Sequence, residues 1–292
     1  MTEYYIGESA RTAGIPTDGG AQAVLRWAHR EALSASKVAI YRAREGRTTL
    51  RFESSGRAFF LKLHRGIGWW EIAKNLLRLR PPVLGASVEY RALDRLQKSD
   101  LLSLQVVAYA SSGFNPARRQ SALVTDALTN TVSLEDVCRN WYRAPPTNRE
   151  KHAIIRALAL TVRRMHDLGL MHRDCYLCHF HLHKDSVRER EPRLSIIDLH
   201  RARYRPRIPL RWRVKDLSAL HFSALECGLG GRDSKLFVRH YVRGNQCNAL
   251  NGLRFWRRVE QRGLQLYRKH GGAEVTQTAT TALETSLRNA DR

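Results

Sequence analysis

The order of hydrophobic and polar residues changes from a strand-like to a helix-like period part way along the chain. Between residues 39 and 63, apolar and polar residues alternate on either side of the turn sequence Ser54-Ser55-Gly56. A period of two predicts two β-strands joined by that turn. Side chains alternate between the two faces of a strand. One face of the second strand is therefore apolar and the other is mixed, with Phe59, Leu61 and Leu63 set against Phe60, Lys62 and His64.

A helix is predicted downstream of the strand that carries Lys62. Residues 65–85 read as a loop with a short helix, closed by Pro81-Pro82. In residues 87–96, Glu89 shares one stripe with Leu93 and Leu96, because positions four and seven apart lie on one helix face. A lysine in a mostly apolar strand is costly to bury without a partner. We therefore expect the inward-facing Glu89 to meet Lys62.

The remaining pattern predicts more strands and then mainly helices. Residues 104–111 and 121–128 read as strands, and apolar residues from Ile154 to Met165 predict a long amphipathic helix that ends near Gly169. Two short strands and two further helices follow, in the segments 171–183, 193–200, 217–225 and around Trp256 and Val259.

This order predicts an α+β chain with two lobes and a cleft between them. We expect an N-terminal extension at 1–36, with a short helix around AQAVLRWAHREAL, and a β-rich N-lobe at 37–127. A mainly helical C-lobe is expected at 128–270, and a polar, disordered tail at 271–292.

Charge is the unusual feature of the composition. The 292 residues include 50 Lys and Arg against 27 Asp and Glu, a net charge of +23, which favours anionic partners such as nucleic acid, an acidic protein, a membrane surface or a phosphorylated substrate. The N-terminus lacks the basic and apolar regions of a signal peptide, and no apolar run is long enough to span a bilayer. The odd count of 5 cysteines favours a reducing cytosol over a disulfide framework.

Four groups that could take part in catalysis occur in one order along the chain: Lys62, Glu89, His172-Arg173-Asp174 and Asp198. This is the layout of the protein-kinase signature set, in a two-lobed protein-kinase-like fold. A lysine held by a carboxylate positions ATP phosphates, and a carboxylate at a strand end binds Mg²⁺. Asp174, in a loop, is the candidate catalytic base that accepts the proton of the acceptor hydroxyl.

The motifs also depart from those of protein kinases. The catalytic loop reads HRDCYLCHF, so His179 stands where the second metal ligand, an asparagine, is expected, and the metal-binding motif reads Asp198-Leu199-His200. A glycine-rich loop is missing, and only Gly46 lies between the first strands, so covering the phosphates would rely on backbone or on Arg44 and Arg47. These departures favour a divergent small-molecule kinase.

Several strings carry a more specific resemblance: LKLHRGIGWWEIAKNLL, VSLED, HRDCYLCHF, IIDLHRA and RWRVKDLSALHFSAL. Over residues 40 to 270 the chain resembles the lipopolysaccharide core heptose(I) kinase family of Gram-negative bacteria. The resemblance implies phosphorylation of the first inner-core heptose from ATP and Mg²⁺ at the cytoplasmic face of the inner membrane, with lipid A–core precursor as acceptor.

Carried over by position, the resemblance assigns a role to each motif residue. Asp174 is the base, Lys62 and Glu89 bind ATP, and Asp198 and His179 bind the metal. The catalytic loop is supported by its own first two residues and by the helix aspartate of the KDL string, namely His172, Arg173 and Asp216.

A cysteine- and histidine-rich stretch allows a second interpretation. Cys175 and Cys178, with His179, His181 and His183, have the ligand types of a zinc knuckle. The three histidines alternate along a strand-like stretch and a second Cys/His pair is absent, so packing of the two cysteines in the catalytic loop is favoured.

Two surfaces are candidates for binding the acceptor. The basic run from Arg201 to Lys215 follows the metal-binding aspartate, and its Arg forks suit phosphates and carboxylates; the candidate residues are Arg201, Arg203, Arg205, Arg211 and Arg213. A solvated charge run is the alternative. Trp69 and Trp70 suit either a membrane interface or core packing.

Two other functions remain as alternatives to the heptose kinase. A related sugar or antibiotic kinase would use the same motifs with another acceptor, and the charge alone would suit a nucleic-acid-binding protein. No RNA-binding motif with base-stacking aromatic residues is present, so nucleic acid is not expected as a partner. An acidic companion protein is a possible counterpart of the charge.

Overall fold

The computed structural model describes residues 2–35, 40–44, 46–77, 85–141, 143–243, 250 and 252–270, with only the backbone at 40–44, 71, 75 and 76. The chain divides into two compact units. The first comprises Met1–Thr129 and Leu199–Arg201, and the second comprises Asn130–Asp198 and Ala202–Arg292. The first is rich in strands and the second mainly helical, as the sequence pattern predicts. The predicted tail, 271–292, lies outside the described residues, as do Pro81-Pro82.

An antiparallel sheet forms the centre of the first unit. Its strand order is β1-β6-β7-β4-β3-β2. The strand bounds are β1 Glu3–Ile6, β2 Ile40–Arg44, β3 Arg47–Ser54, β4 Arg57–His64, β6 Val106–Ser112 and β7 Gln120–Asp126.

The β3–β4 hairpin shows why the predicted turn forms. Ser54 pairs with Arg57, and the two residues between them, Ser55 and Gly56, have φ of 50° and 72°. Positive φ at both central positions gives the type I′ turn, whose twist matches that of the flanking strands. The predicted alternation of β4 is confirmed, because the side chains that join the hydrophobic core are Phe59, Leu61 and Leu63.

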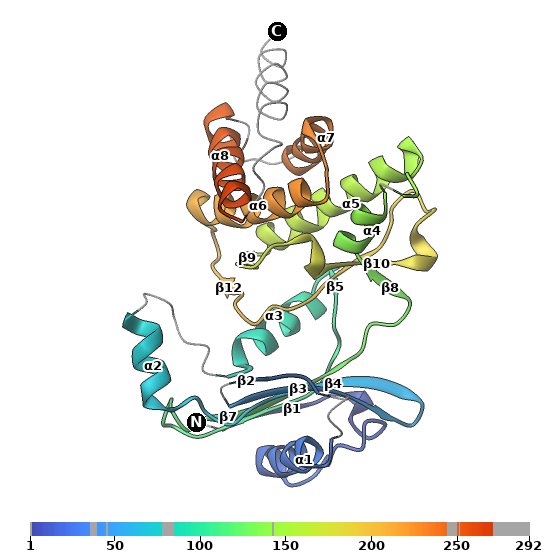
Figure 1. Ribbon diagram of the computed structural model, residues 1–292. Helices are drawn as coiled ribbons and strands as arrows, with labels where there is room; N and C mark the ends of the chain where they lie inside the picture. Colours follow the sequence, from blue (N-terminus) through green and yellow to red (C-terminus); the bar gives the residue numbers. More distant parts are fainter. Residues whose placement is uncertain are drawn as a thin grey trace. The chain divides into compact units, whose positions relative to one another are not determined.

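The N-terminal residues belong to this unit. Strand β1 pairs with β6, and the expected helix is present as α1, Gly20–Ser34. Its buried residues Val24, Leu25 and Ala28 pack in one core with the apolar side chains of β4. Residues 2–34, which the sequence pattern predicts to be an extension, therefore belong to the sheet unit: β1 is an edge strand of the sheet, and α1 covers one of its faces (Figure 1).

Helix α3, Ser87–Gln97, lies on the opposite face of the sheet from α1 (Figure 1). The rings of Tyr90 on α3 and Tyr109 on β6 stack with centroids 4.1 Å apart. The unit also contains α2, Gly68–Leu77, the short strand β5, Leu102–Ser103, and a 3-10 turn, Glu8–Ala10. The α3 face of the sheet is the one that carries Lys62.

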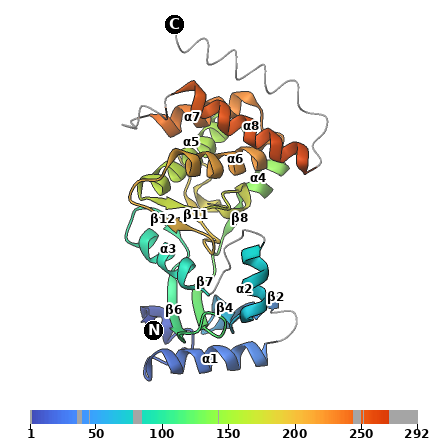
Figure 2. The same ribbon diagram turned by 90° about the vertical axis from the view of Figure 1, so that its left-hand side faces the viewer.

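The second unit is built around α5 and α6 (Figure 2). Helix α5 packs on α7 and α6 packs on α8. The helices are α4 Leu134–Asn140, α5 Asn148–Asp167, α6 Leu210–Glu226, α7 Gly231–Val242 and α8 Leu253–Lys269. Short antiparallel strands lie beside them: β8 Thr131–Ser133, β10 Phe180–His183 and β11 Leu194–Ile196 pair in one group, and β9 Leu170–Met171 pairs with β12 Arg203–Tyr204.

The predicted amphipathic helix is α5. It begins with a capping box, in which Thr147 Oγ1 accepts a hydrogen bond from the Glu150 amide and Glu150 accepts one from the Thr147 amide. Its buried stripe is the predicted one: Ile154, Ile155, Leu158, Val162 and Met165. The helix ends before Gly169, as predicted, and this glycine has φ of 77°. In the part of the chain that the structure describes, no helix has both the length and the apolar character to cross a bilayer.

Candidate active site

The first unit brings together Lys62 and Glu89. Lys62 Nζ lies 2.6 Å from Glu89 Oε1, and the two side chains are 22% and 2% exposed. Glu89 belongs to the buried stripe of α3, and Lys62 points away from the core face of β4, as the two periodicities predict. A carboxylate that is almost fully buried needs a cationic partner, and Lys62 supplies it while its ammonium stays partly open to solvent. The ion pair expected from the sequence is present.

The surroundings of this ion pair are electropositive. His64 lies two residues beyond Lys62 on the same face of β4. Burial, together with the charges of Arg47 and Lys62, lowers the pKa of His64 to about 3. His64 is therefore neutral at physiological pH, which limits the positive charge at this end of the strand.

The turn between β2 and β3 is held against the chain that follows β4. Its Gly46 has φ of 73°, and a Cβ at this position would collide with the Gly66 carbonyl. The Gly46 carbonyl also accepts a hydrogen bond of 2.8 Å from the Arg65 amide. Glycine at position 46 thus allows this close approach. The side chain of Arg44 is outside the described part, so of the two candidate covering arginines only Arg47 is described.

In the second unit, Asp216 holds the HRD loop. One carboxylate oxygen of Asp216 accepts a hydrogen bond of 2.8 Å from the His172 amide, and the other accepts one of 2.8 Å from the Arg173 amide. Arg173 has φ of 70°, a left-handed conformation that costs roughly 1–2 kcal/mol in a non-glycine residue. The two hydrogen bonds offset this cost and fix the backbone immediately before Asp174.

A buried polar network extends behind Asp216, and the sequence did not indicate it. His166 Nε2 lies 3.3 Å from Asp216 Oδ2, and His166 Nδ1 lies 2.7 Å from the Tyr241 hydroxyl. Arg213 donates to that hydroxyl at 2.9 Å and to Asp167 at 3.3 Å. Arg213, predicted to bind the acceptor, is therefore mostly buried and bonded inside the second unit.

His179 connects the HRD loop to Asp198. Its Nδ1 lies 2.7 Å from the Asp174 carbonyl oxygen, and its Nε2 lies 3.5 Å from Asp198 Oδ2. Because a carbonyl oxygen only accepts, Nδ1 carries a proton, and in the neutral ring Nε2 carries the lone pair. An imidazole nitrogen and a carboxylate oxygen thus face each other with a separation that suits two ligands of one cation.

The ring of His172 contacts His179 and the backbone next to Asp198, the two candidate metal ligands. It stacks on the His179 ring at a centroid distance of 5.2 Å, and its Nε2 lies 3.0 Å from the Ile197 carbonyl. Burial, aided by the nearby His179, lowers the pKa of His172 to about 4. A neutral His172 adds no positive charge beside the two candidate metal ligands. Asp198 itself has φ of 58°, a left-handed conformation that aspartate tolerates better than most residues.

The described contacts do not favour the zinc-knuckle interpretation. Within the described ranges, no three or more His, Cys, Asp or Glu side chains form a group placed to hold a metal ion. Cys175 is fully buried and its thiol pKa is raised well above the usual value, while burial raises the pKa of Cys178 to about 12. His181 bonds to Thr131 instead, and His183 to Ser195.

A cluster of cations surrounds Trp212 near the HRD loop. Lys215 Nζ lies 4.3 Å from the centre of the Trp212 ring, and the guanidinium carbons of Arg173 and Arg211 lie 5.5 and 5.9 Å from it. Burial lowers the pKa of Lys215, and repulsion from Arg262, Arg173 and Arg211 adds to this effect. Arg211 is a predicted acceptor-binding residue, and Arg173 is predicted to support the catalytic loop. Lys215, at the end of the basic run, and Trp212 were not among the candidates, although their alternation with arginines was the available signal.

The other candidate arginines are solvent-exposed. Arg203 and Arg205 lie on and after β12, and Arg201 belongs to the first unit. They remain candidates for contact with an anionic acceptor.

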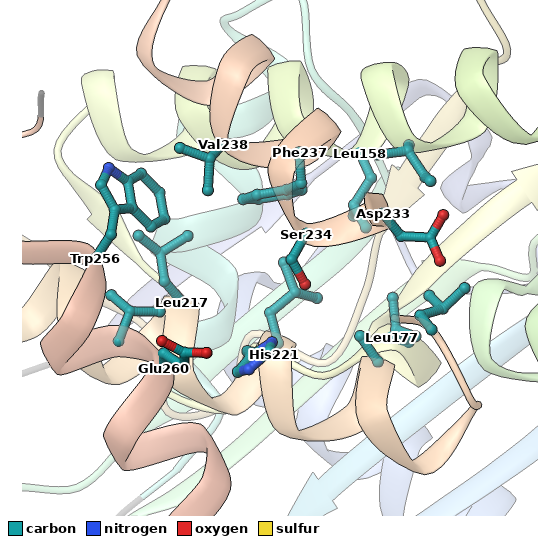
Figure 3. Close-up of a pocket in the computed structure, with 15 residues that line it drawn as sticks. Leu158, Leu177, Leu217, His221, Asp233, Ser234, Phe237, Val238, Trp256 and Glu260 are labelled. Atoms are coloured by element: carbon teal, nitrogen blue, oxygen red, sulfur yellow. The ribbon is translucent and has the colours of Figure 1, made fainter. Parts of the chain in front are cut away.

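An apolar pocket also lies among α5, α6, α7 and α8 (Figure 3). Leu217, Phe237 and Trp256 are among its lining residues, and His221, whose pKa burial lowers to about 4, is one of its few polar groups. None of the residues predicted to act in phosphoryl transfer lines it, so this pocket is separate from the candidate active site.

These features define a class of protein. A buried Lys–Glu pair on a strand and a helix, and an HRD loop held by a helix aspartate, are features of protein-kinase-like phosphotransferases. A model of the lipopolysaccharide kinase (Kdo/WaaP) family matches residues 31–241. The chain therefore belongs to the lipopolysaccharide kinase (Kdo/WaaP) family.

Relatives agree over most of the chain. It is 47% identical over 243 residues to lipopolysaccharide core heptose(I) kinase WaaP of Pseudomonas aeruginosa, covering 82% of this chain and 90% of that protein. It is 48% identical over 203 residues to the Escherichia coli protein of the same name, covering 69% of this chain and 77% of that protein. A solved structure of WaaP in complex with acyl carrier protein has a TM-score of 0.72 and 36% identity, covering 91% of this chain and 99% of that chain. The predicted kinase-like fold class is confirmed.

Proposed function

We propose that this protein is an ATP-dependent kinase that phosphorylates the first heptose of the lipopolysaccharide inner core. The observation that carries the proposal is the geometry around the HRD loop, where Asp216 fixes the backbone before Asp174 and His179 faces Asp198. The acceptor is proposed from the names of the relatives at 47% and 48% identity.

In this proposal Asp174 accepts the proton of the heptose hydroxyl while the hydroxyl oxygen bonds to the γ-phosphorus of ATP, and ADP leaves. The Asp174 backbone is well placed for a fixed role, because its carbonyl accepts hydrogen bonds from His179 Nδ1 and from the Tyr176 amide. Lys62, oriented by Glu89, binds the phosphates of ATP.

Asp198 and His179 would hold magnesium. A carboxylate oxygen fits a hard cation, and sites with one or two protein ligands are usual where substrate phosphates complete the coordination. The nitrogen of His179 fits less well, since magnesium prefers oxygen and imidazole suits softer metals. When bound, the cation neutralises negative charge on the phosphates.

The cation cluster around Trp212 supports an anionic acceptor. Arg173, Arg211 and Lys215 gather within 6 Å of one ring, as their distances of 5.5, 5.9 and 4.3 Å show. Phosphates and carboxylates of a lipid A–core precursor would relieve the mutual repulsion of these cations, and Arg forks bind both groups. The exposed Arg201, Arg203 and Arg205 are proposed to extend this contact.

Location and partners follow from the same chemistry. The acceptor glycolipid is membrane-bound, so we place the enzyme at the cytoplasmic face of the inner membrane of a Gram-negative bacterium as a peripheral protein. The charge of +23 also suits an acidic companion protein, and the solved relative is in complex with acyl carrier protein.

The function is tested by phosphate transfer to a defined acceptor. We expect the purified protein to transfer labelled phosphate from ATP to lipopolysaccharide that lacks inner-core phosphate, and mass spectrometry to place one added phosphate on the first heptose. Double-stranded DNA serves as the binding control. Transfer to another sugar with none to heptose would favour the related sugar-kinase alternative, and tight DNA binding without transfer would favour a nucleic-acid-binding protein.

His179 allows a specific test of the metal assignment. If its Nε2 ligates the cation, His179→Asn should retain or improve the rate with magnesium, because an amide oxygen suits this ion. The wild type should then gain more than the variant when manganese, which accepts imidazole better, replaces magnesium. The measurement is the ratio of the manganese rate to the magnesium rate for both proteins.

His181→Asn is the matched control for this test, because His181 is on the adjacent strand and bonds to Thr131 rather than to Asp198. Its metal ratio should equal that of the wild type. A folded His179→Asn variant that is inactive with both metals would rule out ligation and leave His179 the role of holding the Asp174 carbonyl.

A further inference from the structure

Helix α2 presents an apolar stripe to solvent. Trp69, Trp70 and Leu77 are 61%, 81% and 86% exposed, and Ala73 between them is exposed as well. At 3.6 residues per turn these four positions fall within an arc of about 100°. We call this set of four residues the α2 stripe.

The stripe is not a core-facing surface. On α2 it is Ile72, outside this arc, that is buried, at 7% exposure. The exposures of Trp69 and Trp70 exclude the core-packing interpretation left open by the sequence. Keeping two tryptophans in water is unfavourable, and an exposed apolar patch of this kind on a helix indicates a surface that is covered in use.

A third exposed aromatic residue lies on the turn that contacts the start of α2. Phe114, between β6 and β7, is 91% exposed. The same turn accepts a hydrogen bond of 3.0 Å at its Ala117 carbonyl from the Gly68 amide. Gly66, with φ of 88°, allows the two segments to approach closely, because a Cβ there would lie 2.5 Å from the Ala117 oxygen. The turn and the first residue of α2 are thus fixed to each other (Figures 1 and 2).

Two exposed arginines lie near these aromatic residues. Arg65, three residues before α2, and Arg118, on the β6–β7 turn, are both exposed. Tryptophan favours the boundary between lipid headgroups and acyl chains, and exposed arginines attract anionic headgroups. Tryptophan and arginine are enriched at protein interfaces as well, so the membrane is chosen as the occupant because the proposed acceptor is membrane-bound and the patch combines apolar rings with cations.

We propose that the α2 stripe, together with Phe114, inserts into the interfacial region of a bilayer that contains anionic phospholipid. This inference deepens the proposed function, on which it rests for the choice of a membrane-bound acceptor. Trp69 and Trp70 provide the apolar contact, and Arg65 and Arg118 provide the electrostatic attraction. The docking site lies in the first unit, whereas the candidate catalytic base lies in the second.

The test is binding of the full chain to vesicles of phosphatidylethanolamine and phosphatidylglycerol, measured by co-sedimentation. The Trp69→Ser/Trp70→Ser double variant should bind at least about tenfold more weakly, because it loses most of the inserted apolar area. Vesicles with brominated acyl chains should quench wild-type tryptophan fluorescence and quench that of the double variant much less. Of the four tryptophans that this variant keeps, Trp27 and Trp256 are buried, and Trp141 and Trp212 are half-buried in the second unit. Leu33→Ser, which removes an 80% exposed apolar residue from α1, should bind as the wild type does.

Circular dichroism establishes that the double variant is folded. The proposal is overturned if the wild type does not bind, if the double variant binds equally well, or if salt alone abolishes binding in both proteins to the same extent. It is also overturned if light scattering shows that the stripe instead joins two copies of the chain.

Because the vesicle assay contains neither ATP nor acceptor, its result is independent of the kinase proposal. Transfer to detergent-dispersed acceptor should be equal in the wild type and the double variant. If the wild type does not transfer phosphate to the detergent-dispersed acceptor, the proposed function is contradicted and the membrane-binding proposal is not affected.

Discussion

Asp174→Asn should lower the rate of phosphate transfer by about 10²–10⁴-fold, the usual contribution of a general base. The variant keeps the size of the side chain and the backbone hydrogen bonds of the Asp174 carbonyl, but the amide does not accept a proton. ATP binding should therefore persist. Turnover and nucleotide affinity are measured separately, by transfer to the heptose acceptor and by calorimetry with ATP and magnesium.

Asp185→Asn is the control for this substitution, because Asp185 is an exposed aspartate of the same unit that bonds to Arg193. It should transfer phosphate at the wild-type rate. A folded Asp174→Asn protein with near-normal turnover would remove Asp174 from the mechanism.

Asp198→Ala should abolish transfer at any practical magnesium concentration. The proposed metal site has one carboxylate and one imidazole from the described residues, so loss of the carboxylate leaves no charged protein ligand. The rate is measured as a function of magnesium concentration, with Asp100→Ala, at an exposed position in the first unit, as the control.

Alanine at position 198 also carries a backbone cost, since φ there is 58°. Asp198→Asn avoids it, because asparagine tolerates the left-handed conformation, and this variant should also be severely impaired. Full recovery of either variant by excess magnesium would place the metal on other residues.

The sequence predicts well the elements whose side chains repeat at a regular period. Alternation in β4 and the stripe of α3 are enough to turn Lys62 and Glu89 toward each other, and the structure contains that ion pair. The HRD loop and Asp198 could be found because they stand next to short apolar strands. Their roles in catalysis stay predictions.

Other features depend on contacts between distant parts of the chain, which no local period encodes. Strand β1 has four residues, too few for a clear alternation, and its place beside β6 depends on pairing about a hundred residues away. Arg213 belongs to a basic run, yet it is bonded to Tyr241 near the end of α7 and to Asp167 at the end of α5, because the start of α6 lies beside both helix ends. Likewise, whether Trp69 and Trp70 pack inside or face solvent is decided by which side of α2 meets the protein.

The division of the chain into units has a consequence for how the protein is made on the ribosome. The first unit includes Leu199–Arg201 as well as residues 1–129, so it lacks part of its chain until residue 201 has been synthesised. By then α5 and β10 of the second unit have already been translated. The two units therefore cannot mature strictly one after the other, and cutting the gene at residue 129 would leave the first product without a piece of its own structure.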